Sequence, residues 1–311
     1  MSCETIPLST FRNRSVISMR DFSVADILTI LDFTKVIEEN PSAYSLKGKL
    51  MASCFFEPST RTRLSFEAAM KKPGGDVIGF SDAQSTSTTK KETLHDTIKV
   101  IGHYADVIVI RHPLDGAAAH ASASTDKPVI NAGDGSNQHP TQTLLDLYAI
   151  RESQGRLNNL HIAFTGDLKH ARTIHSLVQA ASYFKMRMYF VAPAGLELPR
   201  QIADDLKRRS ILFSFHPHLI DIMPKLDILY MTRVQEERMA TTFLHSHLSD
   251  HILTSAMLDH AKPTMKVLHP LPRVREIAPD VDNTPHAYYF EQARYGLFIR
   301  QALLTLILGA V

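Results

Sequence analysis

Cysteine is scarce in this sequence, and its cysteines form no motif. The 311 residues include two cysteines, Cys3 and Cys54, and no Cys-x-x-Cys pair, which excludes a zinc knuckle and a dithiol redox centre. A chain this long can bury about three quarters of its unfolded surface, so it needs no disulfide or metal to fold. We therefore expect a protein of a reducing compartment, the cytoplasm, that uses neither a metal nor a cofactor.

A strong excess of charge and a long hydrophobic segment are also absent. The formal net charge is only +2, so neither nucleic acid nor an anionic membrane is expected as the main partner. The most apolar segment, residues 297–311, contains Arg300 and is too short to span a bilayer. The first residues lack the basic and apolar pattern of a signal peptide. Chemistry with phosphate must therefore depend on a local basic pocket.

Two glycine-rich nucleotide motifs are missing as well. No G-x-x-x-x-G-K-[ST] sequence occurs, which argues against a P-loop enzyme. Residues 165–167, Thr-Gly-Asp, follow a predicted strand but do not continue into G-x-G-x-x-G. A bound dinucleotide is therefore not expected.

The sequence does contain a regular alternation of predicted strands and helices. Such alternation favours parallel sheets, and a polar segment at residues 153–156 divides it into two series. We predict an α/β fold of two domains, each a mostly parallel sheet with helices on both faces. The predicted strands are 50–56, 77–80, 107–110, 129–131, 161–165, 188–192, 211–215, 228–231 and 266–268, and the predicted helices include 24–40, 60–71, 92–104, 140–152 and 290–308.

Polar residues follow the first predicted strand, where ligands of parallel sheets usually bind. Residues 59–63 read Ser-Thr-Arg-Thr-Arg and lie at a predicted helix start. Backbone N–H groups, hydroxyls and a guanidinium would converge there, which suits a phosphate dianion. The simpler alternative is a Ser or Thr that caps the helix beside an exposed arginine.

Two further motifs follow later strands. Arg111 ends the strand at 107–110, and the glycine-rich loop 131–142 ends in His139-Pro140-Thr141-Gln142. Pro140 suits the first position of a helix, His139 can donate to a developing oxyanion, and Gln142 can bind an amide. The alternatives are a solvated arginine and an ordinary capping loop.

Together, Ser-Thr-Arg-Thr-Arg, Arg-His-Pro and His-Pro-Thr-Gln occur in the order and spacing of the carbamoyltransferase family, which the sequence resembles over residues 20–308. The resemblance implies a carbamoyl-phosphate-binding domain of residues 1–149 and 290–311 and an aspartate-binding domain of residues 150–289. It also implies that carbamoyl phosphate is held by Ser59, Thr60, Arg61, Thr62, Arg111, His139, Gln142 and the carbonyl groups of Leu271 and Pro272.

The motifs in the second half of the sequence concern the amine that accepts the carbamoyl group, and they favour aspartate. Aspartate carries two carboxylates and so needs at least two cations. Arg172 and Arg233 match the arginines that hold aspartate in that branch of the family, and Gln235 matches a nearby binding position. Residues 269–272 read His-Pro-Leu-Pro, whereas the ornithine branch typically has Cys in place of Pro270 and adds a Met-Gly signature.

The segment from Ser87 to Glu92, Ser-Thr-Thr-Lys-Lys-Glu, resembles the family pattern Ser-x-x-Lys-Gly-Glu. In the family, its serine and lysine reach the active site of a neighbouring subunit. Aligned without a gap, Lys91 replaces the glycine and Lys90 is the functional lysine. With a one-residue deletion, Lys91 is functional instead. The first alignment requires a non-glycine residue to adopt glycine-like backbone angles.

The reaction implied is carbamoyl transfer from carbamoyl phosphate to L-aspartate, an early step of pyrimidine synthesis, with Arg61, Thr62, Arg111 and His139 as catalytic residues. The resemblance also implies a homotrimer with shared active sites, and it allows a separate regulatory chain in an allosteric assembly. Two alternatives stay open: a carbamoyltransferase for another amine such as ornithine, and a catalytically silent homologue that binds anions or organises a complex.

Overall fold

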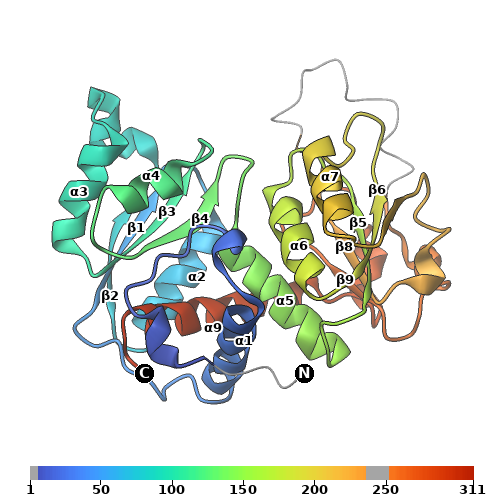
Figure 1. The fold of residues 1–311 in the computed structure, drawn as a ribbon, viewed down its shortest axis with the longest axis horizontal. Helices are drawn as coiled ribbons and strands as arrows, with labels where there is room; N and C mark the ends of the chain where they lie inside the picture. The colour runs from blue at the N-terminus through green and yellow to red at the C-terminus, as the bar shows by residue number, and fades with distance from the viewer. Residues whose placement is uncertain (1–5, 236–251) are drawn as a thin grey trace. The chain divides into compact units, whose positions relative to one another are not determined.

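The computed structural model describes residues 6–235 and 252–311, which form two compact α/β units. The first unit ends at residue 145 and is completed by residues 294–311, and the second comprises residues 146–293. These divisions fall inside two helices, α5 (Pro140–Gln154) and α9 (Tyr289–Ile307) (Figure 1). The predicted fold class, two mostly parallel sheets with helices on both faces, is confirmed.

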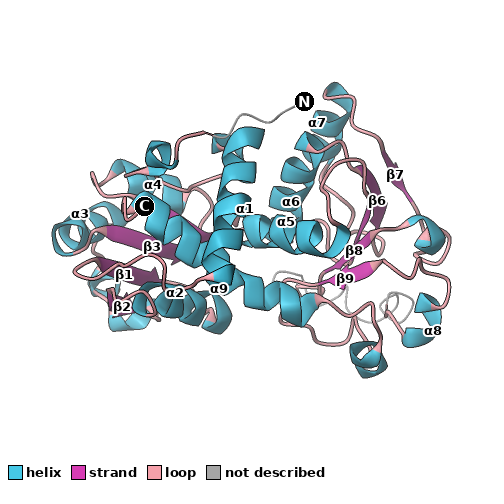
Figure 2. Ribbon diagram, turned by 90° about the horizontal axis from the view of Figure 1, so that it is seen from below, coloured by secondary structure: helices cyan, strands magenta, loops and turns pink. Residues whose placement is uncertain are grey.

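The first unit contains a four-stranded parallel sheet in the order β2-β1-β3-β4. β1, β3 and β4 are buried along most of their length, as expected for strands covered on both faces, whereas the edge strand β2 is half exposed. Helices α3 and α4 cover one face of the sheet, and α1, α2 and α9 cover the other (Figure 2). The bounds are α1 Val24–Glu39, β1 Leu50–Phe55, α2 Thr60–Lys71, β2 Asp76–Phe80, α3 Leu94–Tyr104, β3 Val107–His112, α4 Ala117–Ala123 and β4 Val129–Asp134.

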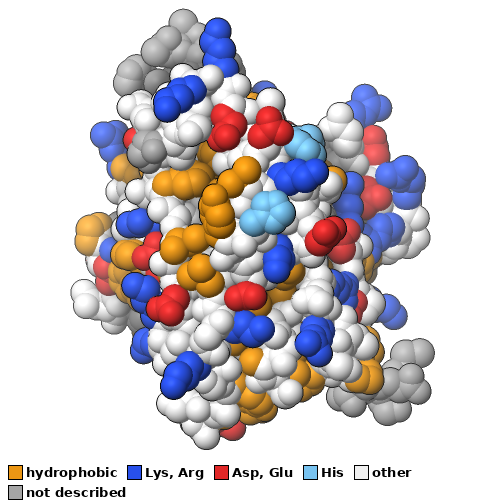
Figure 3. Space-filling view, turned by 90° about the vertical axis from the view of Figure 1, so that its left-hand side faces the viewer, with side chains coloured by type: hydrophobic (Ala, Val, Ile, Leu, Met, Phe, Trp, Pro, Cys, Tyr) orange, Lys and Arg blue, Asp and Glu red, His pale blue; other side chains and the backbone are white. Residues whose placement is uncertain are grey.

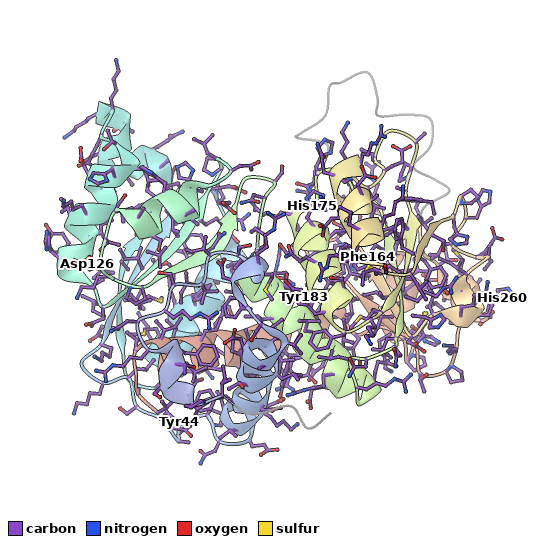
Figure 4. The ribbon with its side chains drawn as sticks, in the orientation of Figure 1. Tyr44, Asp126, Phe164, His175, Tyr183 and His260 are labelled. Atoms are coloured by element: carbon purple, nitrogen blue, oxygen red, sulfur yellow. The ribbon has the colours of Figure 1, made fainter. Side chains whose placement is uncertain are left out.

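The second unit contains a five-stranded parallel sheet in the order β7-β6-β5-β8-β9. Phe164 on β5 is fully buried inside this unit (Figure 4), with its ring 5.6 Å from that of Phe190 and 6.0 Å from that of Tyr230. Helices α6 and α7 lie on one side of the sheet and α8 on the other (Figure 2). The bounds are β5 His161–Thr165, α6 Arg172–Tyr183, β6 Arg187–Val191, α7 Arg200–Arg208, β7 Phe213–Phe215, β8 Ile228–Met231, α8 Ser255–Leu258 and β9 Lys266–Leu268.

All nine predicted strands are present. Two elements, β7 and α3, begin two residues later than predicted, each for a local reason. β7 begins at Phe213 instead of residue 211, because the backbone N–H of Ile211 closes the end of α7 by donating to Leu206. α3 begins at Leu94 instead of residue 92, because the Thr93 side chain caps it. Short 3-10 helices, which the sequence did not indicate, occur at Leu8–Phe11, Met19–Asp21, Ala83–Ser85, Ser87–Lys90, Met223–Lys225 and Pro279–Asn283.

Candidate active site

The Ser-Thr-Arg-Thr-Arg motif lies where β1 runs into α2. Ser59 occupies the N-cap position, but among the described residues no first-turn amide is capped by its hydroxyl. Because the first N–H groups of a helix have no partner within the helix, this end presents donors to a ligand. The arrangement favours the phosphate interpretation of Ser59, Thr60, Arg61 and Thr62 over simple capping.

Arg111 ties together the carboxyl ends of three neighbouring strands. Its backbone carbonyl accepts from the N–H of Phe56, just after β1, at 2.9 Å. Its guanidinium donates to the carboxylate of Glu57 at 2.8 Å and to the carbonyl of Ala132 on β4 at 3.2 Å. Sequence reasoning assigned no role to Glu57, whose only signal is its position beside the phosphate motif. A phosphate at Arg111 must therefore compete with this carboxylate.

The glycine-rich loop after β4 is held by a buried carboxylate. Asp134 accepts from the Asn131 side chain at 2.9 Å and from the backbone N–H groups of Gly116 at 2.8 Å and Gln138 at 3.2 Å. The loop delivers His139, which is 4% exposed, to the start of α5. Thus the predicted phosphate-site residues of this unit all come to the carboxyl edge of one sheet: Ser59, Thr60, Arg61, Thr62, Arg111, His139 and Gln142.

In the second unit, the loops after β5 and β8 come into direct contact. Gly166 has a φ of +107°, and a Cβ there would lie 2.0 Å from the carbonyl oxygen of Thr232, so only glycine fits. Asp167, fully buried, accepts from the backbone N–H of His170 at 2.9 Å and from that of Gln235 at 3.2 Å. Sequence reasoning missed this role of Asp167.

These contacts place the acceptor-site candidates at the carboxyl edge of the second sheet. Arg172 is the first residue of α6 and is 9% exposed. Arg233 follows β8 and donates to the carbonyl of Val234 at 3.2 Å. His175, labelled in Figure 4, lies one turn after Arg172 on α6, and its Nε2 donates to the carbonyl of Leu168 at 2.9 Å. Arg172 at the start of α6, and Arg233 and Gln235 on the loop after β8, therefore lie in segments that neighbouring contacts hold in place.

The third loop of this edge follows β9 and is organised by His269. The backbone N–H of Leu271 donates to His269 Nδ1 at 2.8 Å, so Nε2 carries the proton and donates to Glu276 at 2.7 Å. Leu271 has a φ of +55°, and its bond to Pro272 is cis. Since proline has no N–H, the end of this turn presents only carbonyl acceptors, as binding of an amide group requires.

We expect the Glu276–His269 contact to make stability depend on pH. Burial raises the pKa of Glu276, but the hydrogen bond from His269 and backbone N–H groups lower it further, from 4.5 to about 2. The stabilisation is complete above the ordinary pKa and is lost as the pH falls toward 2. Urea unfolding between pH 5 and about 2.5 should show a smaller loss of stability for Glu276→Gln than for the wild type. Equal losses would contradict this role.

The Ser87–Lys91 segment follows the edge strand β2, and Ser87, Lys90 and Lys91 are exposed. Lys91 adopts a φ of +67°, the left-handed conformation that glycine prefers. The gapless alignment requires this backbone conformation at residue 91. It favours Lys90 as the family lysine.

Residues 6–235 and 252–311, which the structure describes, contain neither a metal-binding cluster nor a membrane-spanning helix. No cluster of three or more His, Cys, Asp or Glu side chains there could hold a metal ion. No helix in those ranges is sufficiently long and apolar to cross a membrane.

Comparisons with known proteins cover both units. Residues 14–152 match the model of the aspartate/ornithine carbamoyltransferase carbamoyl-phosphate-binding domain, and residues 158–307 match that of the aspartate/ornithine-binding domain. The aspartate carbamoyltransferase catalytic subunit of Chromobacterium violaceum is 54% identical over 296 residues, which cover 95% of this chain and 98% of that protein.

Solved structures give the same result. The catalytic subunit of M. jannaschii aspartate transcarbamoylase is 48% identical, with a TM-score of 0.87 and coverage of 94% of this chain and 97% of that one. The Trypanosoma cruzi aspartate transcarbamoylase in complex with carbamoyl phosphate and aspartate is 36% identical, with a TM-score of 0.91 and coverage of 98% and 100%.

Proposed function

The chain belongs to the aspartate/ornithine carbamoyltransferase family, and we propose that it transfers the carbamoyl group of carbamoyl phosphate to L-aspartate. The products are N-carbamoyl-L-aspartate and phosphate, which places the reaction early in pyrimidine synthesis. The main support is the placement of Arg172, at the start of α6, and Arg233, on the loop after β8, where Gly166 and Asp167 hold the loops after β5 and β8 together. Two fixed guanidinium groups suit an acceptor with two carboxylates. The relatives named above are aspartate enzymes. Formation of carbamoyl-aspartate by the purified protein tests the proposal.

The reaction needs no covalent enzyme intermediate. The lone pair of the neutral aspartate amine attacks the carbonyl carbon, and the carbonyl oxygen takes the negative charge. Thr62, Arg111 and His139 stabilise that oxygen, and a donor of this kind contributes about 3–4 kcal/mol. The carbon–oxygen bond to phosphate then breaks, and the phosphate accepts the amine proton. Ser59, Thr60 and Arg61 hold the phosphate, while Gln142 and the carbonyl groups of Leu271 and Pro272 bind the carbamoyl NH₂.

A homotrimer with shared active sites is part of the proposal. Hydrophobic side chains gather on one face of the first unit (Figure 3). Large exposed hydrophobic residues of the first unit include Leu64 on α2, Ile78 on the edge strand β2, and Val100 and Tyr104 on α3, each at least 42% exposed. Exposed hydrophobic side chains that gather on one face favour contact with another chain. Ser87, Lys90 and Lys91, which follow β2 after a short 3-10 helix, are exposed and thus available to a neighbouring subunit.

A pair of variants distinguishes the two lysines. We expect Lys90→Ala to reduce kcat/KM by about 10²-fold, as loss of one or two charge-assisted contacts would. Lys91→Gly should retain activity, because glycine suits a φ of +67° better than lysine does. Loss of activity in Lys91→Gly with normal turnover in Lys90→Ala would reverse the assignment.

Shared sites have a direct consequence for mixed oligomers. Arg61→Ala and Lys90→Ala chains, each nearly inactive, should regain activity when dissociated and reassembled together, because some sites then combine two intact halves. No recovery in verified mixed oligomers would argue that each chain completes its own site.

The proposal extends to location and regulation. The small number of cysteines suits the cytoplasm. The name "catalytic subunit" of the relatives suggests a separate regulatory chain for this protein too, and hence an allosteric assembly. Copurification of a second polypeptide with the native enzyme tests this point.

A further inference from the structure

A fully buried carboxylate in the second unit has no role in the function proposed so far. Asp146 lies on α5 and is 0% exposed. Its two oxygens accept from the hydroxyl of Tyr230 at 2.9 Å and from the side-chain amide of Gln292 at 2.6 Å. Burial of a carboxylate is costly unless donors compensate it. Tyr230 and Gln292, both also buried, provide such donors.

Each of these two partners leads to a loop that binds a substrate. Tyr230 is on β8, three residues before Arg233, and its hydroxyl also interacts with Thr173, the residue after Arg172. Gln292 uses its carbonyl oxygen to accept from the backbone N–H of His269 at 2.8 Å. That N–H lies at the entrance to the His269–Pro272 loop, so Asp146 is linked to both the aspartate and the carbamoyl residues of this unit.

We propose that Asp146 is a positioning residue for the transfer reaction: through Tyr230 it holds the end of β8, which leads to Arg233, and through Gln292 it holds the His269–Pro272 loop. It does not touch a substrate. The inference deepens the proposed function and rests on it, because it assigns kinetic consequences to a network outside the substrate contacts.

The reason for a carboxylate at this position is its hydrogen-bonding character. A carboxylate accepts only, so Gln292 must turn its NH₂ toward Asp146 and its oxygen toward the N–H of His269. Burial and the charge of Asp146 raise the pKa of Tyr230 well above 10, so the hydroxyl stays protonated and donates. In the chain Tyr230–Asp146–Gln292–His269, donation therefore converges on Asp146 from both sides.

Asp146→Asn puts a donor at the point where these donors converge, while leaving the volume almost unchanged. The new NH₂ group must face either Tyr230 or Gln292. If Gln292 turns its amide to accept from it, the Gln292 NH₂ then faces the N–H of His269 and that hydrogen bond is lost. One arm of the network must therefore reorganise although no cavity forms.

We expect Asp146→Asn to lower kcat/KM by about 10²-fold, the cost of a small misplacement of substrate-binding groups, and to raise KM for both substrates. The two arms can be tested separately. Tyr230→Phe should mainly raise KM for aspartate, and Gln292→Leu should mainly raise KM for carbamoyl phosphate. These two variants keep the test decisive if Asp146→Asn fails to fold.

The matched control is Asp227→Asn in the same unit. Asp227 is also a buried carboxylate, 7% exposed, but it lies at the amino edge of the sheet. It accepts from the backbone N–H of His161 at 2.8 Å and from Lys262 at 2.7 Å. Asp227→Asn should lower the melting temperature while leaving both KM values and kcat unchanged.

All variants are assayed as full-length protein at a temperature where each is folded. Normal kinetics in Asp146→Asn, or equal kinetic losses in Asp227→Asn, would overturn the positioning role and leave the proposed function intact. Absence of carbamoyl transfer by the wild type would instead refute the proposed function.

Discussion

Arg61→Ala is expected to reduce kcat/KM by about 10³-fold, the loss that two charge-assisted hydrogen bonds of about 1.5–3 kcal/mol each would cause. Arg61 lies in the first turn of α2, where the helix end presents its N–H groups and Ser59 does not cap them. A guanidinium fork and a helix N-terminus directed at the same dianion reinforce each other. Steady-state kinetics with varied carbamoyl phosphate measures the effect.

Arg63→Ala is the matched control for this prediction. Arg63 lies on the same helix two residues later, but its guanidinium is 3.6 Å from the carboxylate of Glu67. A half-exposed ion pair of this kind contributes little to stability. Since Arg63 is also not proposed to contact phosphate, Arg63→Ala should keep nearly normal kinetics. Near-normal kcat/KM in Arg61→Ala, or an equal loss in Arg63→Ala, would mean that phosphate binds elsewhere.

Arg233→Ala is expected to raise KM for aspartate by about 10²-fold, equivalent to the loss of one charge-assisted contact of about 3 kcal/mol. The KM for carbamoyl phosphate should change much less, because its phosphate contacts are proposed on other loops. Arg233→Lys tests the geometry: it keeps the charge but loses the planar fork, so it should recover only part of the affinity for aspartate.

The control for Arg233 is Arg200→Ala. The Arg200 side chain is 93% exposed and lies 3.7 Å from Asp204 on α7, so its removal should leave both KM values unchanged. If Arg233→Ala raised KM for both substrates equally, the residue would be acting on general structure instead of on the acceptor.

Local patterns predicted most of the fold, because strand and helix signals arise within short segments. They also located the candidate loops, since residues just after parallel strands must come to one edge of a sheet. The hydrogen bonds that hold the loops were not predictable. Glu57 and Arg111 are 54 residues apart, and Asp146 and Gln292 are 146 apart, and no periodicity in the sequence relates such pairs.

Residue 91 shows what the structure adds to a motif. From the sequence, Lys91 was either a substitute for glycine or the functional lysine itself. Its φ of +67° favours the first alternative, because the backbone there has the conformation that glycine prefers. The domain boundaries near residues 149 and 289 stay a prediction, since the units divide inside α5 and α9.

The central claim is most directly tested by competition between acceptors. The purified protein is incubated with carbamoyl phosphate and equal amounts of L-aspartate and L-ornithine, and the products are identified by mass spectrometry. We expect N-carbamoyl-L-aspartate and phosphate in equal amounts and no citrulline. Citrulline as the main product would contradict the roles of Arg172 and Arg233, and no product with either amine would contradict the proposed activity itself.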